Sequence, residues 1–309
     1  MDAKVLLFAL FSVTSRPRTG RSPLRKNTMT MDLKRMTEQV CDLCREVGAF
    51  IDEQARRFDT AKVEFKGPHD YVSYVDKTSE QRLTEGLSRI LPEAGFLAEE
   101  GTRKEGDRFT WIIDPLDGTT NFIHGVPVYA ISIALLDKQA SVATPSAPLA
   151  EGGIVLGVIY HVPMRELFYA CTGEPTRCNG REARVSPMAS FDNALLATGF
   201  PYYDYSRLPA YMKLLEYTML HTAGIRRLGS AALDLAYVAC GRCELFYEYG
   251  LRPWDVAAGL FLVQQAGGTV TDFSGGGRYL FDKEIVATNG PLHAPFLDLL
   301  KQHGLDAKA

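Results

Sequence analysis

Apolar positions recur along the first half of the chain with helical spacing in some stretches and strand spacing in others. Between Met36 and Phe50, apolar side chains return at helical spacing, which predicts an amphipathic helix over 33–58. The stretch 76–91 shows the same spacing and stops before Pro92, so a second helix is expected there. Runs rich in β-branched and aromatic residues predict strands at 71–75, 95–98, 109–114, 127–136, 154–160 and 166–171.

The second half of the chain alternates strand and helix patterns. The stretch 138–153 is rich in Ala, Ser and Pro, which predicts a surface loop, and Asn179-Gly180 marks a hairpin turn. The sequence holds no internal repeat and no apolar run of about 20 residues, the length that a membrane-spanning helix requires. Strands are expected at 194–198, 244–247, 269–272 and 285–288, and helices at 206–221, 229–241, 254–266 and 291–302.

The first 30 residues differ in character from the rest. The apolar run Val5–Phe11 is too short to cross a bilayer, and Lys4 is the only basic residue before it. Several arginines follow the run, and no small-x-small cleavage site is present. We therefore interpret 1–30 as a disordered tail or a start assigned too far upstream, in preference to a targeting segment. The rest, 31–309, is expected to form a single domain of two subdomains with the active site between them.

Composition narrows the class of protein. Hydrophobic residues make up 46% and charged residues 23% of the 309 positions, the balance of a soluble globular enzyme. A net charge of −3 gives no support for nucleic-acid binding. Cys41/Cys44 and Cys240/Cys243 have the spacing of zinc ligands, but both pairs lie in helix-like runs without knuckle glycines. We interpret them as reduced thiols, which agrees with a cytoplasmic protein that has no membrane partner.

One run of nine residues carries most of the chemistry. The predicted strand Phe109–Ile113 leads directly into a carboxylate, and a second carboxylate follows three positions later. Site residues collect where strands end in α/β folds, and the glycine allows close approach of backbone amides to an anion. Two acids and an amide cradle suit a divalent cation and a phosphate together. The run reads Asp114-Pro115-Leu116-Asp117-Gly118-Thr119-Thr120-Asn121-Phe122.

Two other phosphatase chemistries fit less well. Asp117-Gly118-Thr119 is similar to the haloacid-dehalogenase loop, but that loop needs its acids two apart and Pro115 occupies the partner position. Cys171 and Arg177 have the spacing of cysteine phosphatases. Their intervening Glu174 would repel phosphate and Pro175 has no amide to donate, so a hairpin is the better interpretation.

Further motifs occur on both sides of the nine-residue run. An apolar strand leads into Glu99-Glu100, and Trp254-Asp255 opens a predicted helix. Together with Ala197–Pro201, Arg227–Asp234 and Ala266–Gly268, these runs resemble motifs of the inositol monophosphatase family. They occur in the same order as in that family, and the resemblance covers roughly residues 33–303. The resemblance implies the layered αβαβα sandwich of the inositol monophosphatase and fructose-1,6-bisphosphatase type. It also implies a homodimer and a magnesium-dependent, lithium-sensitive hydrolysis of sugar and polyol phosphates.

The resemblance assigns roles to individual residues. It implies two Mg²⁺ ions, with a third, weaker ion near Glu99 and Glu100, and oxygen-only ligation agrees with magnesium over zinc. Thr119 and Asp76 would orient and deprotonate the attacking water, while the Gly118 and Thr119 amides hold the phosphate. The implied metal ligands are Glu99, Asp114, the Leu116 carbonyl, Asp117 and Asp255, and the implied polyol contacts are Gly229, Ser230, Ala231 and Glu248.

Substrate choice depends on a short piece of the nine-residue run. Thr120-Asn121-Phe122 resembles inositol monophosphatases, whereas bisphosphate nucleotidases carry Thr-Lys-Glu at this place, so myo-inositol 1-phosphate is the expected substrate. Bisphosphate nucleotides, fructose 1,6-bisphosphate and histidinol phosphate are the alternatives. A non-catalytic regulatory protein with this fold is a further alternative, but it would be expected to lack some of the acids, and none is missing.

Overall fold

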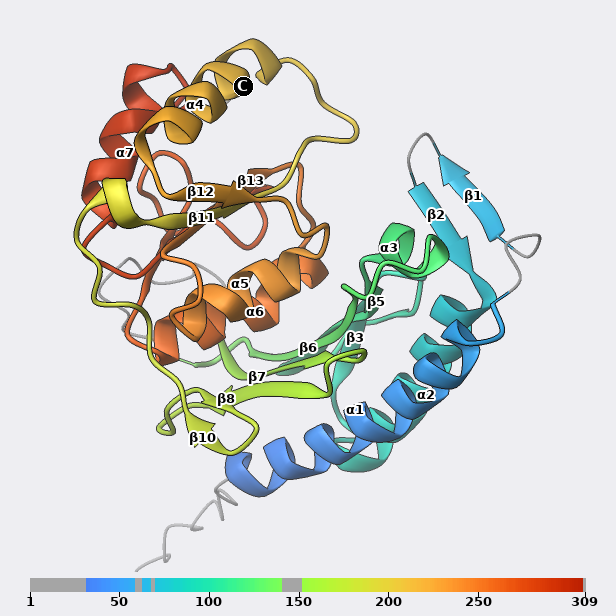
Figure 1. Cartoon of the computed structure of the whole chain (residues 1–309). Coiled ribbons are helices and arrows are strands. Elements are labelled where there is room, and N and C mark those ends of the chain that lie inside the picture. Colours follow the sequence, from blue (N-terminus) through green and yellow to red (C-terminus); the bar gives the residue numbers. More distant parts are fainter. Residues whose placement is uncertain (1–31, 59–62, 68–69, 141–151, 308–309) are drawn as a thin grey trace, which may run out of the picture. The chain divides into compact units, whose positions relative to one another are not determined.

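The computed structural model describes residues 32–58, 63–67, 70–140 and 152–307 (Figure 1). All of them belong to the unit Asp32–Ala309. The predictions for 1–30 and for most of the loop at 138–153 lie outside the described residues. The helices are α1 Leu33–Ala55, α2 Tyr74–Ile90, α3 Thr119–Ile123, α4 Leu208–His221, α5 Ala231–Ala239, α6 Pro253–Gln265 and α7 His293–Gln302, with a short 3₁₀ helix at Phe191–Asn193.

The described strands form a hairpin and two larger sheets. The large sheet has the order β10-β9-β8-β7-β6-β5-β3-β4, antiparallel except for the parallel pair β3–β5. The strands of the hairpin and the large sheet are β1 Val63–Gly67, β2 Asp70–Ser73, β3 Gly95–Ala98, β4 Arg103–Lys104, β5 Phe109–Asp117, β6 Ala130–Asp137, β7 Gly153–His161, β8 Glu166–Cys171, β9 Arg177–Cys178 and β10 Arg181–Glu182.

The second sheet has the order β12-β11-β13-β15-β14, with β11 parallel to both of its neighbours and the other pairs antiparallel. Parallel neighbours need a crossover connection, and α4 and α5 supply it on either side of β12. The strands are β11 Leu195–Thr198, β12 Gly224–Arg226, β13 Leu245–Tyr249, β14 Thr269–Thr271 and β15 Glu284–Thr288.

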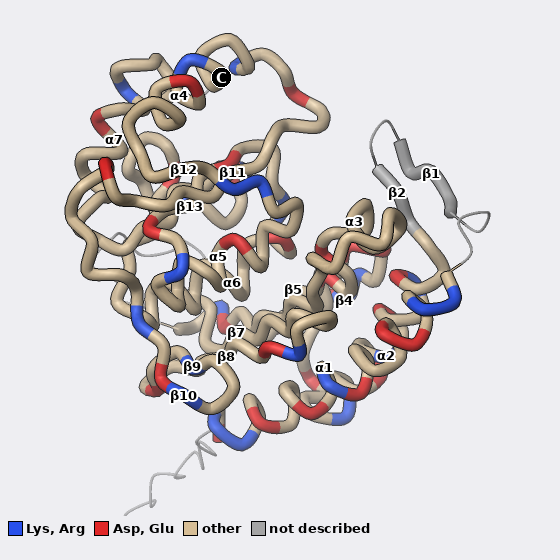
Figure 2. Tube along the Cα trace, viewed as in Figure 1, with Lys and Arg blue, Asp and Glu red and all other residues tan. Residues whose placement is uncertain are grey.

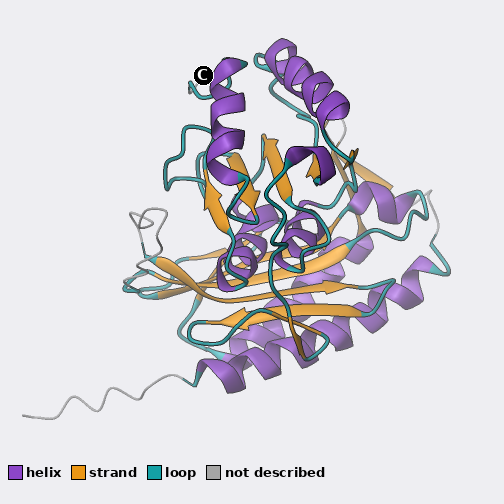
Figure 3. Cartoon of the chain, turned by 60° about the vertical axis from the view of Figure 1, so that its left-hand side comes forward, coloured by secondary structure: helices purple, strands orange, loops and turns teal. Residues whose placement is uncertain are grey.

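The elements stack as five alternating layers, the αβαβα arrangement expected from the sequence (Figure 1). Helices α1 and α2 pack on one face of the large sheet, and α5 and α6 lie between the two sheets. Helices α4 and α7 cover the outer side of the second sheet (Figure 3). The central layer is strongly apolar, with Leu235, Phe261 and Leu262 almost inaccessible to solvent, as a helix enclosed on both sides requires.

Most predicted elements lie within a few residues of the observed ones, and one difference concerns the nine-residue run. The strand was expected to end at Asp114, but β5 continues to Asp117, which pairs with Ala130 of β6. The register shifts between Asp114 and Asp117, which marks a β-bulge. A bulge redirects side chains without ending the pairing, and it therefore brings both carboxylates to one edge of the sheet.

The start of α2 also differs from the expected position. The helix begins at Tyr74, two residues before the predicted start, and its N-cap is Ser73. Asp76 is therefore the third helical residue, where its carboxylate accepts from the Ser73 amide and completes a capping box. Strand β12 and the one-turn helix α3 were not predicted, because each is too short to show a period.

The cysteines are not arranged as a metal site. All six are free, with Cys41 and Cys44 buried in α1, Cys240 at the C-cap of α5 and Cys243 in the connection to β13, beyond the helix that was expected to contain the pair. Burial raises the pKa of Cys41 to about 12, which favours an inert thiol. In the described part of the chain no helix is long and apolar enough to span a bilayer.

A glycine in β7 sets the distance between the large sheet and α6. A Cβ at Gly157 would lie 3.0 Å from the Ala258 carbonyl oxygen and 3.3 Å from the Ala258 Cα. These atoms are helix backbone and cannot rotate away. Since α6 carries Asp255 in its first turn, Gly157 also helps to place a predicted metal ligand.

We expect Gly157→Val to lower the free energy of unfolding by about 1–3 kcal/mol, because the branched side chain must push α6 away from the sheet. Urea denaturation followed by circular dichroism measures the change, with Gly157→Ala as the smaller step in the same series. A Gly157→Val protein as stable as the wild type would contradict the close contact.

Candidate active site

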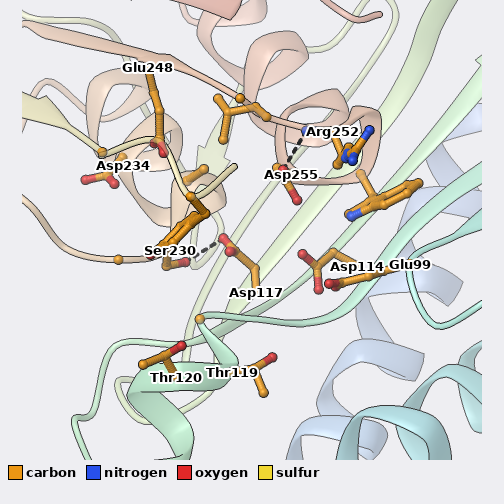
Figure 4. A pocket seen from close by; sticks show the side chains of 18 of the residues that line it. Glu99, Asp114, Asp117, Thr119, Thr120, Ser230, Asp234, Glu248, Arg252 and Asp255 are labelled. Carbon is orange, nitrogen blue, oxygen red and sulfur yellow. Dashed lines mark hydrogen bonds between the residues drawn. The ribbon is translucent and has the colours of Figure 1, made fainter. Parts of the chain in front are cut away.

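One pocket of about 600 Å³ collects nearly all of the residues predicted from the sequence. Its lining comes from the ends of β3, β5, β11 and β13 and from the first turns of α5 and α6, so both larger sheets contribute (Figure 4). Asp76 and Glu100 are the predicted residues that do not line the pocket, and Asp76 contacts Thr119, which does. The predicted residues in the lining are Glu99, Asp114, Leu116, Asp117, Gly118, Thr119, Gly229, Ser230, Ala231, Glu248 and Asp255.

The bulge in β5 is held together by local hydrogen bonds. The Leu116 amide donates to Asp114 Oδ1 at 2.9 Å, which fixes the first carboxylate over the strand. Gly118 then adopts a φ of +93°, and a Cβ there would lie 2.8 Å from the Val128 carbonyl oxygen. Only glycine combines this backbone conformation with this close approach. The backbone amides at the start of α3 are thus held in a fixed position beside Asp114 and Asp117.

Thr119 and Asp76 form the hydroxyl–carboxylate pair that the sequence suggested. Thr119 Oγ1 lies 2.8 Å from Asp76 Oδ1 and 2.9 Å from the Leu116 carbonyl oxygen. A hydroxyl has one proton to donate, so these two acceptors compete for it. Asp76 Oδ2 accepts from the amide and hydroxyl of Ser73 at 2.8 and 2.6 Å. Burial raises the pKa of Asp76, and the hydrogen bonds from Ser73 and Thr119 oppose that rise.

Asp117 is bound to the first turn of α5. Its Oδ2 accepts from Ser230 Oγ and from the Ala232 amide, each at 2.7 Å (Figure 4). Ser230 is also the N-cap of α5, where its Oγ accepts from the Leu233 amide at 3.4 Å. Ser230 was expected to contact the polyol, but its hydroxyl proton is directed to Asp117. Burial raises the pKa of Asp117 to about 6 against these hydrogen bonds.

Asp255 occupies the corresponding place on α6. Its Oδ2 accepts from the Arg252 amide at 2.7 Å, so one carboxylate oxygen caps the N-terminus of the helix. Burial raises the pKa of Asp255 to about 8, with the nearby charge of Asp117 as the next cause. Arg252 itself lines the pocket. The ring of Trp254 is contacted by a different cation, Arg103, whose guanidinium carbon lies 5.0 Å from the ring centroid.

The acids at the centre of the pocket repel one another. Burial raises the pKa of Asp114 well above its usual range, and the charges of Glu99, Asp117 and Asp255 raise it further. Protons or cations are the two ways to relieve such crowding at close range.

The donor chemistry fits a hard divalent cation. Glu99, Asp114, Asp117 and Asp255 offer carboxylate oxygens from four separate elements, and the Leu116 carbonyl lies among them. Mg²⁺ prefers oxygen ligands of this kind and retains several waters, so it does not need a closed cage of protein side chains. Within the described ranges no three acidic, histidine or cysteine side chains are already arranged as such a cage.

The far wall of the pocket is polar and carries two more acids. Glu248 lies in β13, and a Cβ added at Gly199 would lie 2.0 Å from its Cδ atom, so the carboxyl group is packed on bare backbone. Burial raises the pKa of Glu248 to about 8. Asp234 of α5 is 1% exposed, and its Oδ1 has no hydrogen-bond partner among the described residues. Figure 4 places Glu248 and Asp234 across Ser230 from Asp117.

The sequence reasoning did not assign several pocket residues. Asp234, Tyr202, Tyr203 and Arg227 all line the pocket. Arg227 and Asp234 begin and end a run that resembles the family, and Asp234 lies at helical spacing from Ser230, but neither signal gave them a role. Asn121 had no predicted role in the site beyond its part in the family resemblance. Its Nδ2 donates to the carbonyls of Val128 and Leu228, each at 2.8 Å, and so joins the nine-residue run to the chain before α5.

Comparison with known proteins agrees with this geometry. The family model described as the inositol monophosphatase family matches residues 32–305. The chain is 41% identical over 265 residues to the Nus factor SuhB of Pseudomonas aeruginosa, covering 84% of this chain and 93% of the relative. It is 41% identical over 259 residues to the inositol-1-monophosphatase of Mesorhizobium japonicum, covering 83% and 92%.

Solved structures share the fold. The extragenic suppressor protein SuhB of Bartonella henselae superposes with a TM-score of 0.78 at 38% identity, covering 86% of this chain and 98% of that one. The inositol monophosphatase of Thermotoga maritima gives a TM-score of 0.76 at 35% identity, covering 88% and 98%. The layered fold predicted from the sequence is thereby confirmed. On the match over residues 32–305 and these relatives, the chain belongs to the inositol monophosphatase family.

Proposed function

We propose that this protein is a magnesium-dependent phosphatase that hydrolyses myo-inositol 1-phosphate and related polyol monophosphates to the alcohol and phosphate. The observation that carries the proposal is the convergence of Glu99, Asp114, Asp117 and Asp255 on one pocket beside the hydrogen-bonded pair Thr119–Asp76. A partly buried set of acids next to a hydroxyl held by a carboxylate suits water attack on an anionic ester better than it suits a purely structural role.

The acids would hold two to three Mg²⁺ ions. Glu99, Asp114 and the Leu116 carbonyl would bind one ion, and Asp114, Asp117 and Asp255 a second. When bound, the metal lowers the pKa of a coordinated water and neutralises charge on the phosphoryl oxygens. The hydrogen bonds from α5 and from the Arg252 amide leave one oxygen of Asp117 and of Asp255 for this purpose.

The remaining residues would bind and orient the substrate. The Gly118 and Thr119 amides would hold the phosphate, since Gly118 allows the backbone to approach closely. Thr119 would pass the proton of the attacking water to Asp76, because its hydroxyl already lies 2.8 Å from that carboxylate. Gly229, Ala231 and Glu248 would face the polyol, with Ser230 acting chiefly through Asp117.

The relatives suggest two functions. The Mesorhizobium relative is named an inositol-1-monophosphatase, which supports the substrate proposed here. The Pseudomonas relative is named a Nus factor, which favours a non-catalytic role as the second candidate. That role alone would not require the Thr119–Asp76 pair. We also propose a cytoplasmic, lithium-sensitive homodimer, for which light scattering and lithium inhibition are the direct tests.

The substrate can be tested by phosphate release from a panel of esters with and without Mg²⁺. We expect magnesium-dependent turnover that is fastest on inositol 1-phosphate, compared with fructose 1,6-bisphosphate, histidinol phosphate and adenosine 3′,5′-bisphosphate. A different best substrate would retain the chemistry and revise the substrate. A folded protein that hydrolyses none of the four would favour the Nus-factor role.

The proton path can be tested by substitution of Thr119. We expect Thr119→Val to lower kcat by about 10²–10⁴-fold, because the side chain keeps its shape but can no longer move a proton to Asp76. Thr119→Ser retains the hydroxyl and should retain most of the rate. Thr120→Val, at the next pocket residue, is the matched control. Equal losses in Thr119→Val and Thr120→Val would contradict the assigned path.

The pKa shifts predict how pH affects stability. Burial raises the pKa of Asp117 to about 6 and that of Asp255 to about 8, above their unfolded value of 3.8. The folded state therefore holds protons that the unfolded state has lost, and stability decreases as pH rises from near 4 to about 8. We expect the metal-free Tm to fall over this range. Mg²⁺ should raise Tm more at about pH 8 than at about pH 5, because it binds the ionised carboxylates. A magnesium-induced Tm shift that does not depend on pH would contradict this linkage.

A further inference from the structure

Arg227 lies over the part of the pocket expected to receive the alcohol of the substrate. Gly229 has a φ of +81°, and a Cβ added there would lie only 2.5 Å from Arg227 Nη1. The guanidinium therefore covers the bare backbone of Gly229, a residue that the family resemblance places against the polyol. Arg227 lines the same pocket as the predicted metal-ligating acids. In Figure 2 a basic stretch of the chain lies beside β11 and β12, whereas α5 and α6 carry acidic positions.

Neighbouring aromatic residues hold the Arg227 side chain in place. Arg227 Nη2 donates a hydrogen bond to the Tyr202 hydroxyl. The guanidinium carbon lies 5.8 Å from the centroid of the Phe200 ring and 5.7 Å from that of Tyr202, both within range of cation–π attraction. An arginine fixed in this way loses little side-chain freedom when it binds a ligand, which favours binding.

The charge of Arg227 is not matched by a close partner. Among the residues that the structure describes, no carboxylate oxygen lies within 4.0 Å of a guanidinium nitrogen of Arg227, so Arg227 forms no ion pair with them. Asp117, Asp234 and Glu248 interact with it only through longer-range electrostatics. Most of the five N–H donors of the guanidinium are therefore available, and two parallel donors match a phosphate or carboxylate.

The pocket has room beyond a single polyol ring. A second cavity of about 440 Å³ shares Tyr203, Tyr249, Gly250 and Arg252 with the first. Arg252 is exposed and lines both cavities. A substituent on the alcohol thus has space in the region that the two cavities share, where Arg252 is a second cation.

We propose that Arg227, held by Tyr202, binds a second phosphate on the alcohol of the substrate, so that polyol bisphosphates are recognised in addition to monophosphates. The inference rests on the proposed phosphatase function and extends it to a substrate class. A planar base is less favoured at this point, because the Phe200 and Tyr202 rings already contact the guanidinium. A purely structural role, in which Arg227 offsets the nearby acids, would affect every substrate equally.

The test compares kcat/KM for inositol 1,4-bisphosphate and inositol 1-phosphate in matched variants. We expect Arg227→Ala to lower the bisphosphate-to-monophosphate ratio by about 10- to 100-fold, mainly through KM. Arg227→Lys should recover part of the ratio, since it keeps the charge and loses the fork of donors. Tyr202→Phe should lower the ratio by a smaller factor. Arg226→Ala is the control, because Arg226 is equally exposed but does not line the pocket.

Each outcome decides the proposal. An unchanged ratio in Arg227→Ala, or an equal loss with both esters, overturns it and leaves the phosphatase function intact. If the wild type hydrolyses neither ester, the proposed inositol phosphate substrate fails, and the inference is then tested by calorimetric titration of the same two esters. Tighter binding of the bisphosphate that disappears in Arg227→Ala would then support it, and equal affinities would overturn it.

Discussion

Electrostatic repulsion among the buried and partly buried carboxyl groups of one pocket is the constraint on which the site depends. The charges of Glu99, Asp117 and Asp255 raise the pKa of Asp114, and the charge of Asp117 raises that of Asp255. A fold would not keep such groups together for stability alone, since each is costly to bury. A divalent cation would relieve this repulsion by binding the same carboxylates, and this is the physical basis for the metal chemistry proposed for the pocket.

The acids reach the pocket because the fold brings several element ends to one place. The bulge in β5 turns two carboxylates to the same edge, and the first turns of α5 and α6 meet them from the central layer. The contact of Ser230 and Ala232 with Asp117 joins the large sheet to α5, and the Arg252 amide fixes Asp255. The site is therefore shaped by backbone groups, which hold their positions more closely than surface side chains.

Local patterns in the sequence predicted most of the strands and helices and the paired carboxylates Asp114 and Asp117, whereas the αβαβα architecture and the full acid set were implied by the family resemblance. Strands such as Phe109–Ile113 are continuous apolar runs, and the carboxylates stand directly where those runs end. The hydrogen bond from Ser230 Oγ to Asp117 was not predicted, because nothing in the sequence shows that a hydroxyl 113 positions away reaches this carboxylate. Arg227 and Asp234 were not assigned for the same reason. Their roles depend on contacts between separate elements, which no local period reports.

The most direct test of the account is the anomalous scattering of Mn²⁺ in crystals of the wild-type protein. Manganese prefers the same oxygen ligands as magnesium, so it reports where such cations bind. The account predicts anomalous peaks among Glu99, Asp114, Asp117 and Asp255, with the Leu116 carbonyl in one coordination shell. Well-ordered crystals that show no peak in this pocket, or a peak only elsewhere, would contradict the claim that these acids form a metal centre.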